Sequence, residues 1–211
     1  MTWLSGGVRR ATGEITTLIT MSGDQPRRVR WRLLAARDEQ RMVKIHRAIK
    51  GADVLEGFVL EVGARWNSFA SFDWNLMGVN GFVAVRTAQI QRVDRADRGR
   101  IGRRTLELHG EWPPARPPAP LALDRTGALL QSVAAQSPLI VIGYENQYPD
   151  ECMIGAMLAT KNKKLTLRLV SPRARWIGDG QWPFRELTWI EFGGNYEAAL
   201  AELAGPLPAE S

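Results

Sequence analysis

The chain has 211 residues, of which 45% are hydrophobic and 24% charged, and it contains eight tryptophans. This composition supplies enough apolar material for a packed core and excludes a wholly disordered chain. The net charge of +6 originates near the N-terminus, because residues 1–50 hold eleven basic and four acidic residues. Such asymmetry is typical of proteins that bind nucleic acids or other anionic surfaces, and a solvated arginine-rich leader produces it equally well.

Residues 1–40 are interpreted as a basic N-terminal extension. Within it, residues 14–35 suit a β-hairpin, because a Thr- and Ile-rich run and an alternating apolar–basic run flank a turn at 22–26. A helix over residues 31–42 fits the same sequence. The pattern leaves both alternatives open.

Two segments, 57–93 and 155–192, look like divergent copies of one β-rich unit. Gly57 opens the first copy and Gly155 the second. The later anchors of the alignment pair Gly81 with Gly180 and Val93 with Phe192. Each copy holds about five short strands, with Asn80-Gly81 expected as a tight turn and a loop at 178–180. Five short strands suit a small barrel, because closure removes free strand edges.

The predicted fold is therefore mainly β with minor α: two tandem small barrels, at residues 41–110 and 139–205. Residues 111–138 between them are a Pro-rich linker followed by a helix, which we expect to begin at Asp124 and reach about Gln136. A second helix is predicted at 195–204, with Asn195 as its cap.

The run from Gly57 through Trp66 to Phe82 resembles the Sm/SH3-like superfamily of small barrels. The second half, from Tyr148 to Gly155 and from Phe192 to Leu200, resembles a bacterial family known from actinobacteria. The first resemblance implies a tandem pair of Sm-like barrels. Small barrels bind RNA, DNA and proteins, so the fold leaves the function open.

Cys152 is the single cysteine, which excludes an intrachain disulfide and a zinc site with several cysteines. Its neighbours Asp150 and Glu151 should raise the pKa of the thiol, so we expect a buried structural residue in a reducing, cytoplasmic protein. His46 and His109 lie in predicted strands, outside any catalytic motif. We therefore expect no enzyme, no cofactor and no metal. No apolar run suits a membrane span, and none near the N-terminus suits a signal peptide.

Nucleic-acid binding has the best physical support, because sites for single strands combine cationic side chains with aromatic rings. Two basic segments carry the predicted contacts, 27–32 and 161–175, and the second contains no acidic residue. The predicted phosphate-binding residues are Arg28, Arg30, Arg32, Lys161, Lys163, Lys164, Arg168, Arg173 and Arg175. A third basic run covers residues 92–104. The alternative is a protein-binding module, of the immunity or regulatory kind, that uses an aromatic surface patch.

Overall fold

The computed structural model describes residues 25–148 and 151–208, and this part of the chain is mainly β, as expected. Its α-helices are α1 (Gln25–Asp38), α2 (Gly99–His109), α3 (Thr126–Ala134) and α4 (Asn195–Ala204). The strands of the N-terminal half are β1 (Met42–Arg47), β2 (Leu55–Val62), β3 (Trp66–Asp73), β4 (Gly78–Arg86) and β5 (Ile90–Arg95). Those of the C-terminal half are β6 (Ile140–Gly143), β7 (Cys152–Lys161), β8 (Lys164–Val170), β9 (Trp176–Pro183) and β10 (Trp189–Phe192). Two 3₁₀ turns, η1 (Thr87–Gln89) and η2 (Phe184–Glu186), precede β5 and β10.

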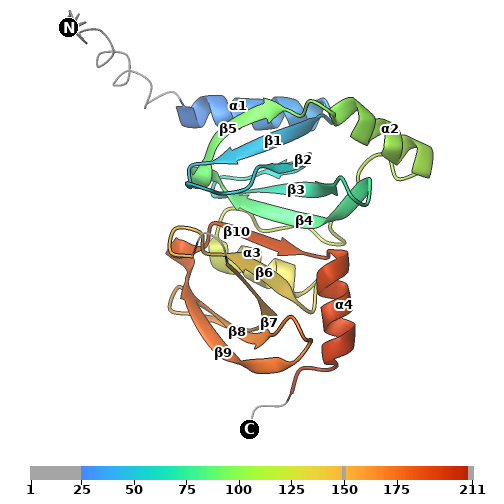
Figure 1. Ribbon diagram of the computed structural model, residues 1–211. Helices are drawn as coiled ribbons and strands as arrows, with labels where there is room; N and C mark the ends of the chain where they lie inside the picture. Colours follow the sequence, from blue (N-terminus) through green and yellow to red (C-terminus); the bar gives the residue numbers. More distant parts are fainter. Residues whose placement is uncertain (1–24, 149–150, 209–211) are drawn as a thin grey trace, which may run out of the picture.

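These strands form one open antiparallel sheet in the order β5-β1-β2-β3-β4-β10-β6-β7-β8-β9 (Figure 1). The first five strands have the order β5-β1-β2-β3-β4, and the last five repeat it as β10-β6-β7-β8-β9. At the centre β4 pairs with β10, so the two halves are joined edge to edge. The outer edges of this sheet are β5 and β9.

The two halves agree in register as well as in strand order. Gly57 lies opposite Ser71 on β3, and Gly155 lies opposite Leu169 on β8. A one-residue irregularity follows each glycine at the same place, between Val59 and Glu61 on β2 and between Met157 and Ala159 on β7. A Cβ on Gly57 would overlap the carbonyl oxygen of Ala70, and one on Gly155 would overlap that of Arg168. Both copies therefore need glycine at this point for the same steric reason.

The later anchors of the sequence alignment are shifted by two residues. Val93 pairs with Ile45 on β1, and the residue that pairs with Ile142 on β6 is Ile190, not Phe192. The tight turn predicted at Asn80-Gly81 is also wrong, because the turn lies at residues 74–77. Gly81 lies inside β4 with φ +74°, where a Cβ would press on the backbone of Phe192 and Gly194. The seam between the halves requires this glycine.

The basic segment 27–32 lies in helix α1, so the hairpin predicted over 14–35 is wrong for its described part, and residues 14–24 lie outside the described residues. Val29, Leu33 and Ala36 are buried, whereas Trp31 between them is 69% exposed. Apolar residues spaced four and three apart form one face of a helix. This spacing prevails over the alternation of apolar and basic residues that suggested a strand. The rival prediction of a helix is correct in kind, although the helix begins and ends earlier than expected.

The sheet has helices on both faces and at its sides (Figure 1). Helix α1 packs on β2 and β5, and α2 closes a cluster around Phe58 and Phe72. The basic run 92–104 is thus the end of β5 and the first half of α2, and His109 ends that helix. Helix α4 has the bounds predicted from the sequence and covers Leu139 and Val170, although its N-cap is Gly194 and not Asn195. The loop expected at 178–180 is part of strand β9 instead.

The Pro-rich segment does not act as a free spacer, because Trp112 before it and Leu121 after it pack into apolar clusters. Its end pairs with the first half of the sheet, since Trp66 N–H donates to the carbonyl of Leu123 at 3.1 Å. Leu121 and Leu123 are buried with α3 in the largest apolar cluster. Asp124 does not cap α3. Its carboxylate accepts a hydrogen bond from the backbone of Ala64, and the helix begins after Arg125.

Candidate functional site

A groove of about 980 Å³ lies where the two halves of the sheet meet the start of α3. The β2–β3 loop, the end of β4, the first turn of α3, the β7–β8 turn and η2 all contribute to it. The cationic side chains that line it are Arg65, Arg86, Arg125, Lys163, Lys164 and Arg185. Among its described lining residues no carboxylate occurs, although Glu186 beside it pairs with Arg185 at 3.2 Å. The lining of the groove therefore carries a high density of positive charge.

Arg86 is the fixed point of this groove. Its Nε donates to the carbonyl of Leu187 at 2.7 Å, and its terminal nitrogen donates to the carbonyl of Phe184. The guanidinium lies 5.0 Å from the ring centre of Trp66. Burial and, second, the like charge of Arg65 lower the pKa of Arg86. The two carbonyl groups orient the Arg86 guanidinium without neutralising its charge. An anion bound in the groove would therefore be attracted by a fixed positive charge.

The first turn of α3 points its N-terminal end into the same groove. Thr126, Gly127 and Ala128 all line the groove, and no side chain caps the helix. Uncapped N–H groups and the helix dipole attract anions such as phosphate. A hydrogen bond from the first half of the sheet holds this turn in place. The indole N–H of Trp66, at the start of β3, donates to the Thr126 hydroxyl at 3.1 Å.

The opposite wall is the tight turn between β7 and β8. Asn162 and Lys163 have φ values of 53° and 58°, as a two-residue hairpin turn requires. This geometry presents Lys163 and Lys164 to solvent at the rim of the groove. Phe184 of η2 lies between this turn and α3, partly buried against the core, and adds an aromatic ring to the lining.

A second cavity of about 630 Å³ continues from the groove and shares Arg65 and Arg86 with it. Its lining is more apolar and includes Val29 of α1 and Ile90 of β5. The cationic groove therefore opens toward the start of α1 across the β2–β3 loop.

The structure gathers only part of the predicted phosphate-binding set. Lys163 and Lys164 line the groove, and Lys161 is exposed at the adjacent end of β7. Arg173 and Arg175 are exposed in the loop at the other end of β8, one strand length of about 20 Å away. A third group of three arginines lies on α1: Arg28, Arg30 and Arg32. The nine residues do not form one continuous site.

Several predicted arginines are held by other parts of the fold. Arg168 pairs with the Asp179 carboxylate on β9, and Arg30 donates to the carbonyl of Gly63 at 3.1 Å. Arg32 donates to the carbonyl of Val93 at 2.9 Å and lies 3.7 Å from Asp94. These contacts orient the side chains toward the protein.

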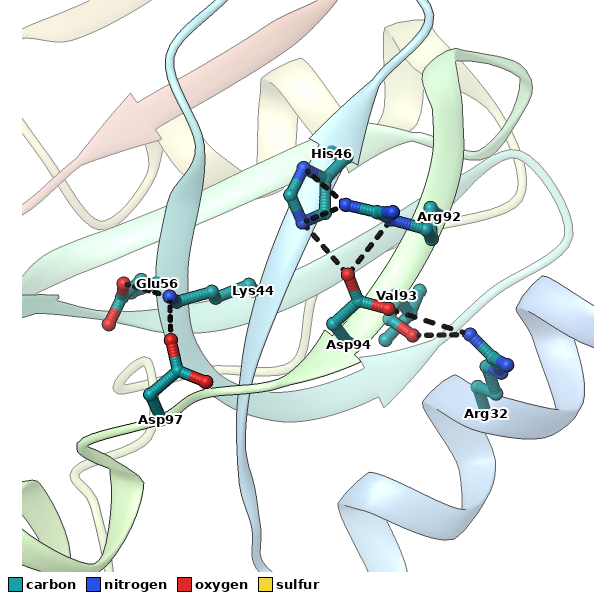
Figure 2. A network of polar contacts seen from close by, with 8 residues as sticks. All are labelled: Arg32, Lys44, His46, Glu56, Arg92, Val93, Asp94 and Asp97. Carbon is teal, nitrogen blue, oxygen red and sulfur yellow. Dashed lines mark hydrogen bonds and ion pairs between the residues drawn. The ribbon is translucent and has the colours of Figure 1, made fainter.

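Figure 2 shows the network to which Arg32 belongs. Asp94 on β5 also accepts from Arg92 at 2.8 Å and lies 3.1 Å from Nε2 of His46. The hydrogen bond to Val93 uses a carbonyl on the outer edge of β5, and Gln25 likewise donates to the Gln91 carbonyl at 2.8 Å. The network therefore fastens α1 to the edge strand. His46 faces a carboxylate at the surface, outside the cavities described above.

Four residues of the groove were missed from the sequence: Arg65, Arg86, Arg125 and Arg185. Each is an isolated arginine at the end of a strand, in a turn or at the start of a helix, so none stands out as a charge run. The alignment of Gly81 with Gly180 also paired Arg86 with Arg185, and the strand register now separates these two positions. The signal that could have found Arg86 and Arg185 is the recurrence of arginine where β4 meets η1 and β9 meets η2.

Cys152 is exposed, contrary to the expectation of a buried thiol. Partial desolvation raises the pKa of its thiol, and Glu191 and Glu197 raise it further.

Within residues 25–148 and 151–208, no three His, Cys, Asp or Glu side chains are grouped to hold a metal ion. In the same part of the chain no helix combines the length and the apolar character needed to cross a membrane.

The chain has no match among protein families, curated proteins or solved structures.

Proposed function

We propose that the chain is a cytoplasmic, non-enzymatic module of two tandem small barrels that binds single-stranded nucleic acid in the groove at α3. The repeated five-strand order supports the tandem interpretation, with the halves sharing one continuous sheet. The observation that carries the functional proposal is the cationic lining without a carboxylate, contributed by both halves and by the start of α3.

The chemistry of the groove matches a sugar–phosphate backbone with bases attached. Lysine and arginine side chains on opposite walls suit successive phosphates, and the N-terminus of α3 adds N–H donors for one of them. Phe184 offers a ring on which a base can stack. Because the bases of a single strand are exposed, such a strand can use both features at once.

The alternative of an aromatic protein-binding patch has less support. The exposed large aromatic side chains among the described residues are Trp31, Tyr148 and Tyr196, which belong to α1, the loop after β6 and α4. Trp31 is surrounded along the helix by arginines, and Trp74 and Trp112 are covered by Arg98 and Arg103. No aromatic cluster free of cations is formed by these residues.

The test is binding of a fluorescent single-stranded oligonucleotide, followed by anisotropy between 50 and 300 mM salt. We expect Lys163→Ala/Lys164→Ala to weaken binding about tenfold and to lower the magnitude of the salt slope by about 1.4, since each lost phosphate contact removes about 0.7. Arg173→Ala/Arg175→Ala is the matched control, because it removes the same charge outside the groove. Equal effects of the two pairs, or an affinity independent of salt, would reject the proposal.

A further inference from the structure

The second cavity, beside the cationic groove, has the size and lining of a pocket for a small organic group. Val29 of α1 and Ile90 of β5 are 4% and 6% exposed and supply buried apolar surface. Ala48, Ala64 and Ala88 also line the cavity and are exposed, so they lie at its rim. A volume of about 630 Å³ and a mostly apolar lining with a few polar groups are typical of ligand pockets.

Backbone hydrogen bonds hold the walls of this cavity in place. The N–H of Thr87 in η1 donates to the carbonyl of Arg65 in the β2–β3 loop at 2.8 Å. The N–H of Ala48, which follows β1, donates to the carbonyl of Gln89 at 2.8 Å. Both bonds join segments that are far apart in the sequence. Because the walls are already ordered, a ligand would lose little free energy in shaping the cavity.

The polar groups of the cavity are of two kinds. Arg65 and Arg86 line both the cavity and the groove, so the passage between them is cationic. Gln91 of β5 also lines the cavity and is exposed. Its side-chain amide can both donate to and accept from the polar edge of a heterocyclic ring. The lining therefore suits an anionic group that is attached to a flat, largely apolar ring.

We propose that this cavity binds one base of the single strand that occupies the groove, with the phosphate of that nucleotide at Arg65 and Arg86. This inference rests on the proposed function of the groove. The shared arginines select the occupant, because an apolar peptide side chain would gain nothing from two cations. A phosphate backbone alone would gain nothing from Val29 and Ile90. A nucleotide uses both parts of the lining at once, so the cavity adds base-dependent affinity to the phosphate contacts of the groove.

The test measures, by anisotropy, the binding of two fluorescent strands of equal length to the full chain. One is an oligodeoxynucleotide, and the other is an abasic strand that keeps every phosphate and has no bases. Ala88→Trp places an indole at the rim of the cavity and removes no charge. It should weaken binding of the oligodeoxynucleotide about tenfold, as expected for the lost contact of one base, and leave binding of the abasic strand unchanged. Ala198→Trp, at an exposed alanine of α4 outside the cavity and the groove, is the matched control and should change neither.

Gln91→Ala is a second variant that leaves the cavity open and the backbone contacts of β5 intact. It should weaken the oligodeoxynucleotide severalfold and spare the abasic strand. Unchanged affinity of the oligodeoxynucleotide in both variants would overturn the inference. So would an equal loss for both strands, because the cavity would then contact the backbone and not a base.

These outcomes are separate from a failure of the groove itself. Lys163→Ala/Lys164→Ala should weaken both strands, since both carry the same phosphates, whatever the cavity binds. If neither strand binds the natural chain, the proposed function is rejected and this inference with it. If both strands bind with the expected dependence on salt and Ala88→Trp has no effect, only the assignment of the cavity is wrong.

Discussion

Arg47 and Glu145 form a buried ion pair across the junction of the two halves of the sheet. Nη1 of Arg47, at the end of β1, lies 2.7 Å from the carboxylate of Glu145, which follows β6 by two residues. Their side chains are 3% and 6% exposed. The carboxylate also accepts from the Thr188 hydroxyl at 2.8 Å, and Arg47 donates to the carbonyl of Asp53. The pair links the first strand of one half to the loops of the other.

Breaking one partner of this pair should destabilise the chain strongly. Glu145→Gln leaves the Arg47 charge buried without a counter-charge, so we expect a loss of about 3 kcal/mol in the free energy of unfolding. Replacing both residues, as Arg47→Met with Glu145→Leu, should recover most of that loss, because no charge is then left buried. Urea denaturation of the single and double variants checks this. A double variant as unstable as the sum of Arg47→Met and Glu145→Leu, each measured alone, would show that packing alone explains the effect.

Gly57 and Gly155 should respond to substitution in the same way. An alanine at either position places a Cβ on a backbone carbonyl of the neighbouring strand, and backbone yields less easily than the end of a side chain. We expect each Gly→Ala change to cost about 2 kcal/mol or more of stability. Gly78→Ala, in β4, is the control, since its Cβ would meet its nearest neighbours at 3.8 Å. Thermal unfolding of the three variants measures the difference.

The sequence predicted the elements that depend on neighbouring residues and missed the contacts between residues far apart in the chain. Helix α4 was predicted with the correct bounds, because the spacing of Leu200 and its neighbours is a local signal. Helix α1 was ambiguous, since five residues around Trp31 fit both periodicities. The pairing of β4 with β10 left no local trace, apart from Gly81, whose meaning was misread.

The groove was only half predicted for the same reason. Lys163 and Lys164 stand in a visible charge run, and they do line the site. Arg65 and Arg125 lie far apart in sequence and meet only because Leu123 and Trp66 dock the end of the Pro-rich segment on β3. Charge density along the chain therefore located one wall of the site and not the other.

Arg86 and Arg125 should differ in what they contribute. Arg125→Ala removes a rim charge, so oligonucleotide affinity should fall severalfold with the melting temperature unchanged. Arg86→Lys keeps the charge and loses the two-pronged donation to Leu187 and Phe184, so stability should fall by about 1–2 kcal/mol as well as affinity. Anisotropy and thermal unfolding on the same samples separate the two effects. A loss of stability in Arg125→Ala equal to that in Arg86→Lys would contradict the assigned roles.

Glu191 should make the stability of the fold depend on pH. Burial, and second the nearby Glu197, raise the pKa of its carboxyl to about 7. A raised pKa means that the folded chain holds this proton more tightly than the unfolded chain, whose carboxyl ionises near pH 4.5. Stability should therefore fall as the pH rises from about 4.5 to 7 and then stay level.

Glu191→Gln removes that penalty, so the variant should be more stable than the natural chain by about 2 kcal/mol at pH 8 and about equal to it at pH 4. Urea denaturation at both pH values measures the difference. Glu151→Gln, at an exposed position outside the sheet core, serves as the control and should follow the natural chain at both. A gain for Glu191→Gln of the same size at pH 4 and pH 8 would show that side-chain shape, and not the ionisation of this carboxyl, determines the result.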